Sequence, residues 1–194
     1  MSSSWPDIRN VVTFGTSLTA RGGWQQPLAH ALEKIYGHKV EVSIIAKSGE
    51  DSRWGLANVG RVIAAKPDVV LIEFAVNDAS LVHLVSKAQS RRNTAMIVAR
   101  IREKVPAARI FLMSMSPVWG YRFWVRPFLN SYYDQQKELA HDLRVGFIEN
   151  RGSWSRLSPA ELRQAIPDRG HPRPEVATRL IVPHIVAAIT APHP

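Results

Sequence analysis

"NVVTFGTSLTARGGW", residues Asn10–Trp24, is the stretch that decides the fold. Its apolar opening, "NVVTF", predicts a short strand, and small and hydroxylated residues then break that pattern before a helical pattern begins. Ser17 lies in this break. A serine between a strand and a helix is most often a cap or turn former, because its hydroxyl can satisfy a free backbone N–H. Whether Ser17 is a nucleophile instead therefore depends on partners elsewhere in the chain.

The rest of the chain repeats the alternation of strand and helix. Apolar runs predict five strands, over residues 10–14, 40–46, 69–76, 109–115 and 145–148. Apolar residues at helical spacing predict helices over residues 24–35, 56–63, 97–105, 131–143 and 174–189, with Pro183 kinking or splitting the last one. Strands that alternate with helices predict right-handed crossovers and a parallel sheet covered on both faces. We therefore predict an α/β fold, formed as one domain over residues 1–194.

Composition limits the classes of protein to consider. A chain of 194 residues with 45% hydrophobic residues can bury one full core. It has no run of eighteen apolar residues, which argues against a membrane-spanning helix. Met1–Asp7 lacks the charged-then-apolar layout of a signal peptide, so we expect a cytoplasmic protein. The absence of cysteine removes disulfides, thiol catalysis and thiolate metal sites.

The chain is basic, with 25 Lys and Arg against 16 Asp and Glu and a net charge of +9. This balance favours anionic partners such as nucleic acid, acidic polysaccharide or a phospholipid surface. Because the basic residues are dispersed and do not form a run, an arginine-rich solvated surface is the favoured explanation of the charge.

Polar residues come directly after the first three predicted strands and in the long loop after the fifth. In doubly wound sheets, ligands bind outside the carboxyl ends of the strands, so these groups should share one rim. The groups are Gly15–Ser17, Lys47–Asp51, Asn77–Asp78 and Asp168–Pro172.

This rim contains every group that a serine nucleophile requires: a base, an acid that orients the base, and donors for the developing oxyanion. His171 can act as the base, and Asp168 lies three residues earlier, close enough to reach the other imidazole nitrogen. The oxyanion donors would be the backbone N–H groups of Ser17 and Gly49 and the side-chain amide of Asn77. Singly, each residue has a structural explanation as a turn, strand end or helix cap. Their coincidence on one rim favours catalysis.

The chain resembles the SGNH or GDSL hydrolases, whose sequence blocks appear here in order as "FGTSLT", "AKSGEDS", "EFAVNDA" and "DRGHP". The stretch "IREKVPAARIFLMSMSPV" is similar to that family's helix, proline and fourth strand. The resemblance implies a flavodoxin-like three-layer α/β/α sandwich with a five-stranded parallel sheet. It also implies Ser17 as nucleophile, Gly49 and Asn77 as oxyanion residues, Asp168 and His171 as acid and base, and no metal or cofactor. The order Ser, Asp, His also fits α/β-hydrolases, but this chain has no G-x-S-x-G elbow.

Two positions depart from the pattern of the family that the chain resembles. Thr16 stands where that family usually has Asp, and Ala75 where it usually has Gly. Neither departure removes a catalytic group. We expect the threonine hydroxyl to replace part of the hydrogen bonding of the Asp, and Ala75 to narrow the pocket.

The leading functional hypothesis is a serine ester hydrolase that removes small acyl groups, such as acetyl, from a carbohydrate or similar ester. No long apolar lid is visible that would cover a fatty chain. A lysophospholipase or thioesterase, an acyl transferase, and a non-catalytic module that binds glycan or nucleic acid remain alternatives. The seven histidines show no H-x-x-x-H spacing, which argues against a metal enzyme.

The segment "WGYRFWVRPF", residues 119–128, is a candidate substrate-binding element after the fourth strand. Its aromatic side chains could stack on sugar rings while its arginines meet acidic groups, and the same mixture suits single-stranded nucleic acid. A loop packed on the core or in a dimer contact is the other interpretation. The hydrolase residues nearby favour a glycan ester, including an anionic one, over nucleic acid. The candidate binding residues are Trp119, Tyr121, Arg122, Trp124 and Arg126.

Overall fold

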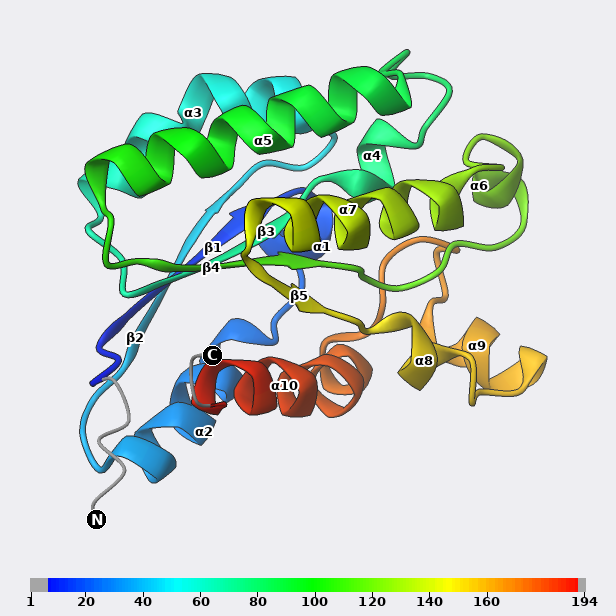
Figure 1. Cartoon of the computed structure of the whole chain (residues 1–194). Helices are drawn as coiled ribbons and strands as arrows, with labels where there is room; N and C mark the ends of the chain where they lie inside the picture. The colour runs from blue at the N-terminus through cyan, green and yellow to red at the C-terminus, as the bar shows by residue number, and fades with distance from the viewer. Residues whose placement is uncertain (1–6, 192–194) are drawn as a thin grey trace.

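The structure, a computed structural model, describes residues 7–191 and has the predicted α/β architecture (Figure 1). Five parallel strands form one sheet in the order β2-β1-β3-β4-β5. The strand order reverses between β1 and β3, so the carboxyl ends of these two strands flank the crevice in which such sheets bind ligands. The strands are β1 Asn10–Gly15, β2 Glu41–Ala46, β3 Val69–Glu73, β4 Arg109–Met113 and β5 Gly146–Ile148.

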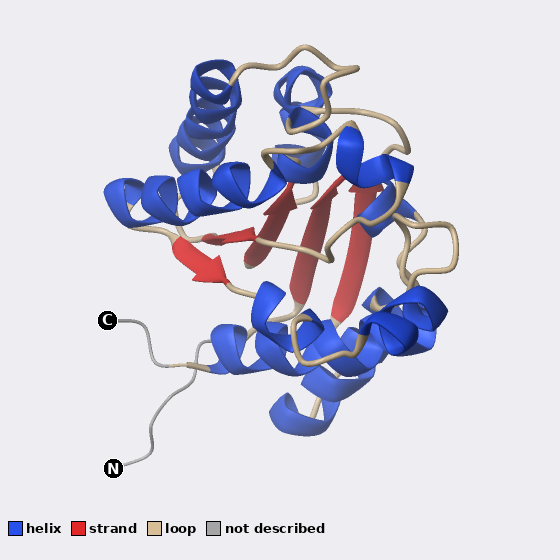
Figure 2. Ribbon diagram, turned by 90° about the vertical axis from the view of Figure 1, so that its right-hand side faces the viewer, coloured by secondary structure: helices blue, strands red, loops and turns tan. Residues whose placement is uncertain are grey.

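Helices cover both faces of the sheet (Figures 1 and 2). α2 and α10 pack on one face, and α3, α5 and α7 lie over the other. Within residues 7–191, five short helices lie in the loops beyond the carboxyl ends of the strands. The helices are α1 Ser17–Ala20, α2 Gln25–Tyr36, α3 Ser52–Ala64, α4 Ala75–Asp78, α5 Lys87–Lys104, α6 Tyr121–Trp124, α7 Leu129–Leu143, α8 Arg151–Trp154, α9 Pro159–Ala165 and α10 Pro174–Thr190.

The strand β1 shows why the apolar runs lack clear alternation. Val11 packs into the core beside α2 and α10, whereas Val12 and Phe14 pack into the core beside α3 and α5. All three side chains are fully buried. Because both faces of a parallel sheet are covered, its strands read as nearly continuous apolar sequence.

The predicted end of the third strand is wrong. β3 stops at Glu73, and Ala75–Asp78 form the short helix α4, because the backbone N–H groups of Asn77 and Asp78 bond to the carbonyl of Phe74. The fourth strand likewise ends at Met113, two residues before its predicted end. Ala75 is buried in the core and does not line the cleft that Ser17, Asn77 and His171 border, so the expectation that it narrows the pocket is also wrong.

The last helix is continuous, so the prediction that Pro183 could split it is wrong. Proline lacks an N–H and removes one bond of the helix. Ile181 and Ile185, on either side of Pro183, are fully buried and hold the adjoining turns against the core.

Two helices begin well before their predicted starts because polar side chains cap them. The Asp51 carboxylate accepts from the N–H of Arg53 at the start of α3, and the Ser86 hydroxyl accepts from the N–H of Gln89 at the start of α5. Apolar spacing alone does not report such caps.

No helix within residues 7–191 has the length and hydropathy that crossing a bilayer requires. The expectation that the chain carries no signal peptide rests on Met1–Asp7, of which residues 1–6 lie outside the described part of the chain.

Candidate active site

Ser17, His171 and Asp168 meet at the carboxyl end of β1. Ser17 is the first residue of α1, and its Oγ lies 2.8 Å from His171 Nε2. The other imidazole nitrogen, Nδ1, lies 2.5 Å from Asp168 Oδ2. The three side chains therefore form a continuous hydrogen-bonded series that joins the first βα turn to the loop before α10.

The loop that carries the acid and the base is organised by the acid itself. Asp168 Oδ1 accepts from the backbone N–H groups of Gly170, at 3.0 Å, and His171, at 2.7 Å. Oδ2 is then left to hold the imidazole. One carboxylate oxygen therefore stabilises the turn, and the other accepts the hydrogen bond from the imidazole.

The charges favour a carboxylate beside a neutral imidazole. Burial opposes ionisation of Asp168, but hydrogen bonds from the side chain and backbone of His171 and from the N–H of Gly170 outweigh it and lower the pKa of Asp168 to about 2. Burial lowers the pKa of His171 below 6.5, although Asp168 acts in the opposite direction. At neutral pH the imidazole keeps its proton on Nδ1, donates that N–H in a hydrogen bond to the Asp168 carboxylate, and turns an Nε2 lone pair towards Ser17.

Arg21 adds positive charge beside this pair. Its Nη2 lies 2.8 Å from His171 Nδ1 and 3.9 Å from Asp168 Oδ2. A protonated Nδ1 has no lone pair to accept from a guanidinium, so the nearby carboxylate is the partner of both groups. The charge of Arg21 also disfavours the imidazolium form.

Donors from two further loops complete the site. Ser17, Gly49, Asn77 and His171 line one cleft of about 190 Å³. Gly49 has φ +79°, a left-handed conformation that favours glycine, and a Cβ built there would meet no atom within 4 Å. The requirement for glycine at this position therefore includes its backbone conformation.

The orientation of the Asn77 amide is fixed by its partners. Its Oδ1 accepts from Arg126 Nη2 at 3.2 Å, and its Nδ2 donates to the carbonyl of Glu50 at 2.8 Å. Because a guanidinium can only donate and a carbonyl can only accept, the reverse orientation would break both bonds. The second Nδ2 hydrogen is then left for an acceptor in the cleft.

Asp78 holds the short helix that carries Asn77. Its carboxylate is buried and accepts from the backbone N–H of Ser52 at 2.9 Å and from the hydroxyl of Ser90 at 2.5 Å. Burial raises the pKa of Asp78 to about 6, against these hydrogen bonds. Asp78 thus ties α4 to α3 and α5 instead of capping a following helix.

Glu73 is a site residue that the sequence analysis missed. This last residue of β3 is buried beneath the nucleophile turn, where its Oε1 accepts from the N–H of Thr16 at 2.6 Å and from the hydroxyl of Thr19 at 2.7 Å. The Thr16 hydroxyl lies 3.0 Å from both carboxylate oxygens. A Cβ at Gly15 would come within 2.2 Å of Oε1, so glycine makes room for the carboxyl group. The available signal was an acidic residue at the end of an otherwise apolar strand.

The network around Glu73 explains the departure at Thr16. The Thr16 hydroxyl accepts from the N–H of Leu18 and so caps α1. An Asp at position 16 would supply both a capping oxygen and a carboxylate next to Ser17. In this chain Thr16 supplies the capping oxygen, and Glu73 supplies the carboxylate. Burial raises the pKa of Glu73 to about 7, against hydrogen bonds from Thr19 and Thr16.

We expect the substitution Thr16→Asp to destabilise the protein, and more strongly at alkaline pH. It places a second carboxylate against buried Glu73, and two such groups tolerate each other only while they share a proton. Since the pKa of Glu73 is raised to about 7, that proton is present at acid pH and is lost as the pH rises. Calorimetry should show a decrease in Tm of roughly 10 °C at about pH 8.5, for a cost of about 3 kcal/mol, and a smaller decrease at about pH 5.5.

Thr16→Asn is the matched control, because it has the same shape as Thr16→Asp without the charge. Equal Tm values for the two variants at both pH values would contradict this account of Glu73.

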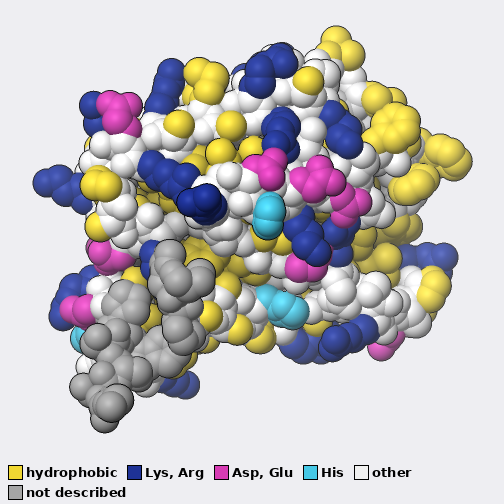
Figure 3. Space-filling model, in the orientation of Figure 1, with side chains coloured by type: hydrophobic (Ala, Val, Ile, Leu, Met, Phe, Trp, Pro, Cys, Tyr) yellow, Lys and Arg dark blue, Asp and Glu magenta, His cyan; other side chains and the backbone are white. Residues whose placement is uncertain are grey.

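The candidate binding segment is divided by the structure. Arg122 and Arg126 line the cleft, whereas the three aromatic candidates do not. Trp119 packs at the edge of the core and donates from Nε1 to the carbonyl of Ile166 at 2.8 Å. Tyr121 and Trp124 are exposed on α6, in a part of the surface where hydrophobic side chains protrude (Figure 3).

The site can attack a carbonyl carbon. It offers a hydroxyl bonded to a neutral base, a carboxylate that orients the base, and polar N–H groups across a shared cleft, which is the arrangement for acyl transfer through a covalent intermediate. Within residues 7–191, no three His, Asp or Glu side chains form a group that could hold a metal ion.

Comparisons with known proteins agree with this geometry. A model of the GDSL-like lipase/acylhydrolase family matches residues 12–178. A GDSL esterase/lipase of Arabidopsis thaliana is 28% identical over 127 residues, which cover 57% of this chain and 51% of that protein. The matched stretch thus spans about half the length of that relative.

Solved structures share the fold at low sequence identity. A lipase/acylhydrolase from Enterococcus faecalis is 23% identical, with a TM-score of 0.79 and coverage of 94% of this chain and 96% of that one. An acetylxylan esterase from Geobacillus stearothermophilus is 20% identical, with a TM-score of 0.78 and coverage of 95% of both chains. These likenesses show the flavodoxin-like arrangement of sheet and helices.

Proposed function

The chain belongs to the GDSL-like lipase/acylhydrolase family, and on this premise we propose that it hydrolyses carboxylic esters through an acyl-enzyme on Ser17. The observation that carries the proposal is the series Ser17 Oγ, His171 and Asp168, with contacts of 2.8 Å and 2.5 Å. Ordinary turn serines have no such base and acid behind them.

The reaction proceeds in two halves. Ser17 Oγ attacks the ester carbonyl while its proton passes to His171 Nε2, and the carbonyl oxygen becomes negative. The bond to the alcohol then breaks, and His171 returns the proton to the departing oxygen. In the second half, His171 takes a proton from water, the hydroxide attacks the acyl-enzyme, and Ser17 leaves with that proton.

The negative oxygen is stabilised by three donors: the backbone N–H groups of Ser17 and Gly49 and the amide of Asn77. Donors of this kind act mainly in the transition state, where the charge develops. Arg126 and the carbonyl of Glu50 hold the Asn77 amide in its orientation before the substrate reacts. The amide therefore does not have to reorient during the reaction.

We place a small acyl group, such as acetyl, in this site. Beside the cleft, Ser17 and His171 also border a recess of only about 10 Å³. Arg21 lines it too, but most of its lining is apolar and includes Leu18, Trp24, Met115, Ala177 and Ile181. A recess of this volume is about the size of a single water molecule and suits a methyl group rather than a chain. That an acetylxylan esterase shares this fold supports our choice of an O-acetylated carbohydrate as the proposed substrate class.

An acyl-length series tests the proposed acyl group. We expect kcat/KM for 4-nitrophenyl acetate to exceed that for the octanoate by about tenfold or more, since a longer chain has to displace packed side chains. Equal or greater turnover of the octanoate would instead favour the lysophospholipase or thioesterase alternative.

Two variants of α10 provide a matched comparison for this series. Ile181→Val and Ile189→Val each remove one methylene from a buried side chain, but only Ile181 borders the recess. Only Ile181→Val should therefore raise the rate ratio of propionate to acetate. An identical ratio in both variants would contradict the placement of the acyl group in the recess.

A further inference from the structure

The cleft carries an excess of positive charge. Three arginines, Arg21, Arg122 and Arg126, line it together with His83 and His171. Among the residues that the structure describes, no Asp or Glu lines the same cleft. Asp168, behind His171, is the one carboxylate that these arginines approach within 4.0 Å in the described part of the chain.

Arg126 is the least compensated of the three. Its guanidinium is half-buried, and its hydrogen bonds go to neutral oxygens: Nε donates to the carbonyl of Val76 at 2.8 Å and Nη2 to Asn77 Oδ1 at 3.2 Å. Burial lowers the pKa of Arg126, and repulsion from Arg122 lowers it further. A charge withdrawn from water without an anionic partner is costly, which is why buried charges are generally paired.

Arg122 and Arg21 are only weakly paired. Arg122 donates from Nε to the backbone carbonyl of Asp168 at 3.1 Å, and its Nη2 stays 3.9 Å from Asp168 Oδ2. Arg21 Nη2 also lies 3.9 Å from that oxygen. Asp168 already accepts from His171 at 2.5 Å, and only Arg21 and Arg122 approach it. One carboxylate therefore offsets at most one of the three guanidinium charges, and about two positive charges are left in the cleft.

We infer that the ester cleaved here carries an anionic group, a carboxylate or a phosphate, near the scissile bond, and that Arg126 and Arg122 bind it. This inference rests on the proposed ester hydrolysis and narrows its substrate class. Arg126 contacts Asn77, which faces the reacting carbonyl oxygen, so an anion on Arg126 belongs to the same small substrate. Planar guanidinium groups with free N–H donors match the oxygens of carboxylate and phosphate.

Two matched pairs of acetyl esters test the inference and separate the two anions. The first pair is an O-acetylated methyl glucuronoside and its uronamide, and the second is acetylglycerol phosphate and acetylglycerol. For the wild type at low ionic strength, kcat/KM should favour the charged member of at least one pair by about tenfold or more. The preference should weaken as salt is added. Preference in the first pair identifies a carboxylate, and preference in the second identifies a phosphate.

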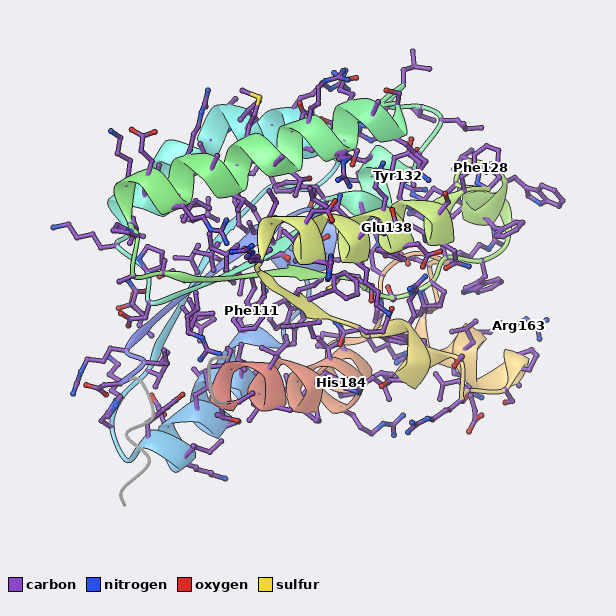
Figure 4. All side chains as sticks on the ribbon, in the orientation of Figure 1. Phe111, Phe128, Tyr132, Glu138, Arg163 and His184 are labelled. Carbon is purple, nitrogen blue, oxygen red and sulfur yellow. The ribbon has the colours of Figure 1, made fainter. Side chains whose placement is uncertain are left out.

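Three arginine variants supply the comparison. In Arg122→Gln and Arg126→Gln the ratio of charged to neutral turnover should fall towards one. In Arg122→Gln the fall should come mainly from a higher KM for the charged ester, whereas Arg126→Gln should also lower kcat for both esters, because Arg126 holds the Asn77 amide. Arg126→Lys keeps the charge and should retain part of the ratio even if Arg126→Gln folds poorly. Arg163→Gln, on exposed α9 away from the cleft, is the control in which the ratio should not change (Figure 4).

The possible outcomes distinguish a failure of the anionic-substrate inference from a failure of the proposed ester hydrolysis. Equal turnover of both members of both pairs overturns the anionic substrate but leaves ester hydrolysis standing. The arginine variants could also lose activity on charged and neutral esters by the same factor. That result would show that Arg122 and Arg126 have only a structural role, and it would likewise overturn the anionic substrate. If the wild type hydrolyses none of the four esters or the 4-nitrophenyl esters, the proposed function itself fails.

Discussion

Ser17→Ala is expected to lower kcat for an acetyl ester by on the order of a millionfold, and His171→Ala by a similar factor. The nucleophile and its base act as one unit, so loss of either removes covalent catalysis altogether. For the same reason the double variant should be no worse than either single one. Initial rates on 4-nitrophenyl acetate, after correction for the spontaneous reaction, are the direct measurement.

The control for this experiment is a serine that lies outside the site. Ser155 is exposed at the end of α8, and Ser155→Ala should keep the wild-type rate. The Ser17→Ala variant should also keep its Tm, because the hydroxyl bonds to His171 and not to the core. Retention of about a tenth of the wild-type rate by Ser17→Ala would be incompatible with a reaction that depends on this hydroxyl.

Asp168→Asn is expected to reduce kcat by on the order of ten thousandfold while leaving the fold intact. The substituted amide keeps an oxygen for the N–H groups of Gly170 and His171, so the turn survives. At Nδ1, however, an NH₂ group replaces the carboxylate oxygen. The imidazole must then accept at Nδ1 and carry its proton on Nε2, where it can no longer take one from Ser17.

Asp168→Ala separates orientation from folding of the loop. It removes both carboxylate oxygens, so it should lower activity as Asp168→Asn does and also lower Tm. An Asp168→Asn enzyme within about tenfold of the wild-type rate would mean that another group orients His171.

The sequence was sufficient to predict the sheet because the signal there is local. The continuous apolar residues of β1 and β3 are required wherever a parallel sheet is covered on both faces, and they appear in the printed sequence. The prediction failed at Ala75 and Val76, the last two residues of the predicted strand, for a related reason. That turn of helix is as buried as the strand before it, and hydrophobicity alone does not distinguish the two.

The same locality explains how far the site could be predicted. Asp168 and His171 are three residues apart on one loop, so their pairing follows from the sequence and the structure places them in contact. Ser17, Gly49 and Asn77 follow strands whose carboxyl ends must share one edge, which predicts that they meet without predicting how closely. Their catalytic roles remain predictions for the experiments above.

The sequence by itself determined the α/β class, the strand ends that carry the reactive residues, and the pairing of Asp168 with His171. Only the tertiary structure decided that Glu73 supports the turn at Thr16 and that Arg126 orients the Asn77 amide. It also decided that Trp119 bonds to the carbonyl of Ile166, at the start of the loop that carries Asp168 and His171. These contacts join residues that are tens of positions apart, with separations of 57, 49 and 47 positions. Side-chain periodicity records which face of an element is buried, whereas a contact across elements depends on the distances and orientations that packing sets.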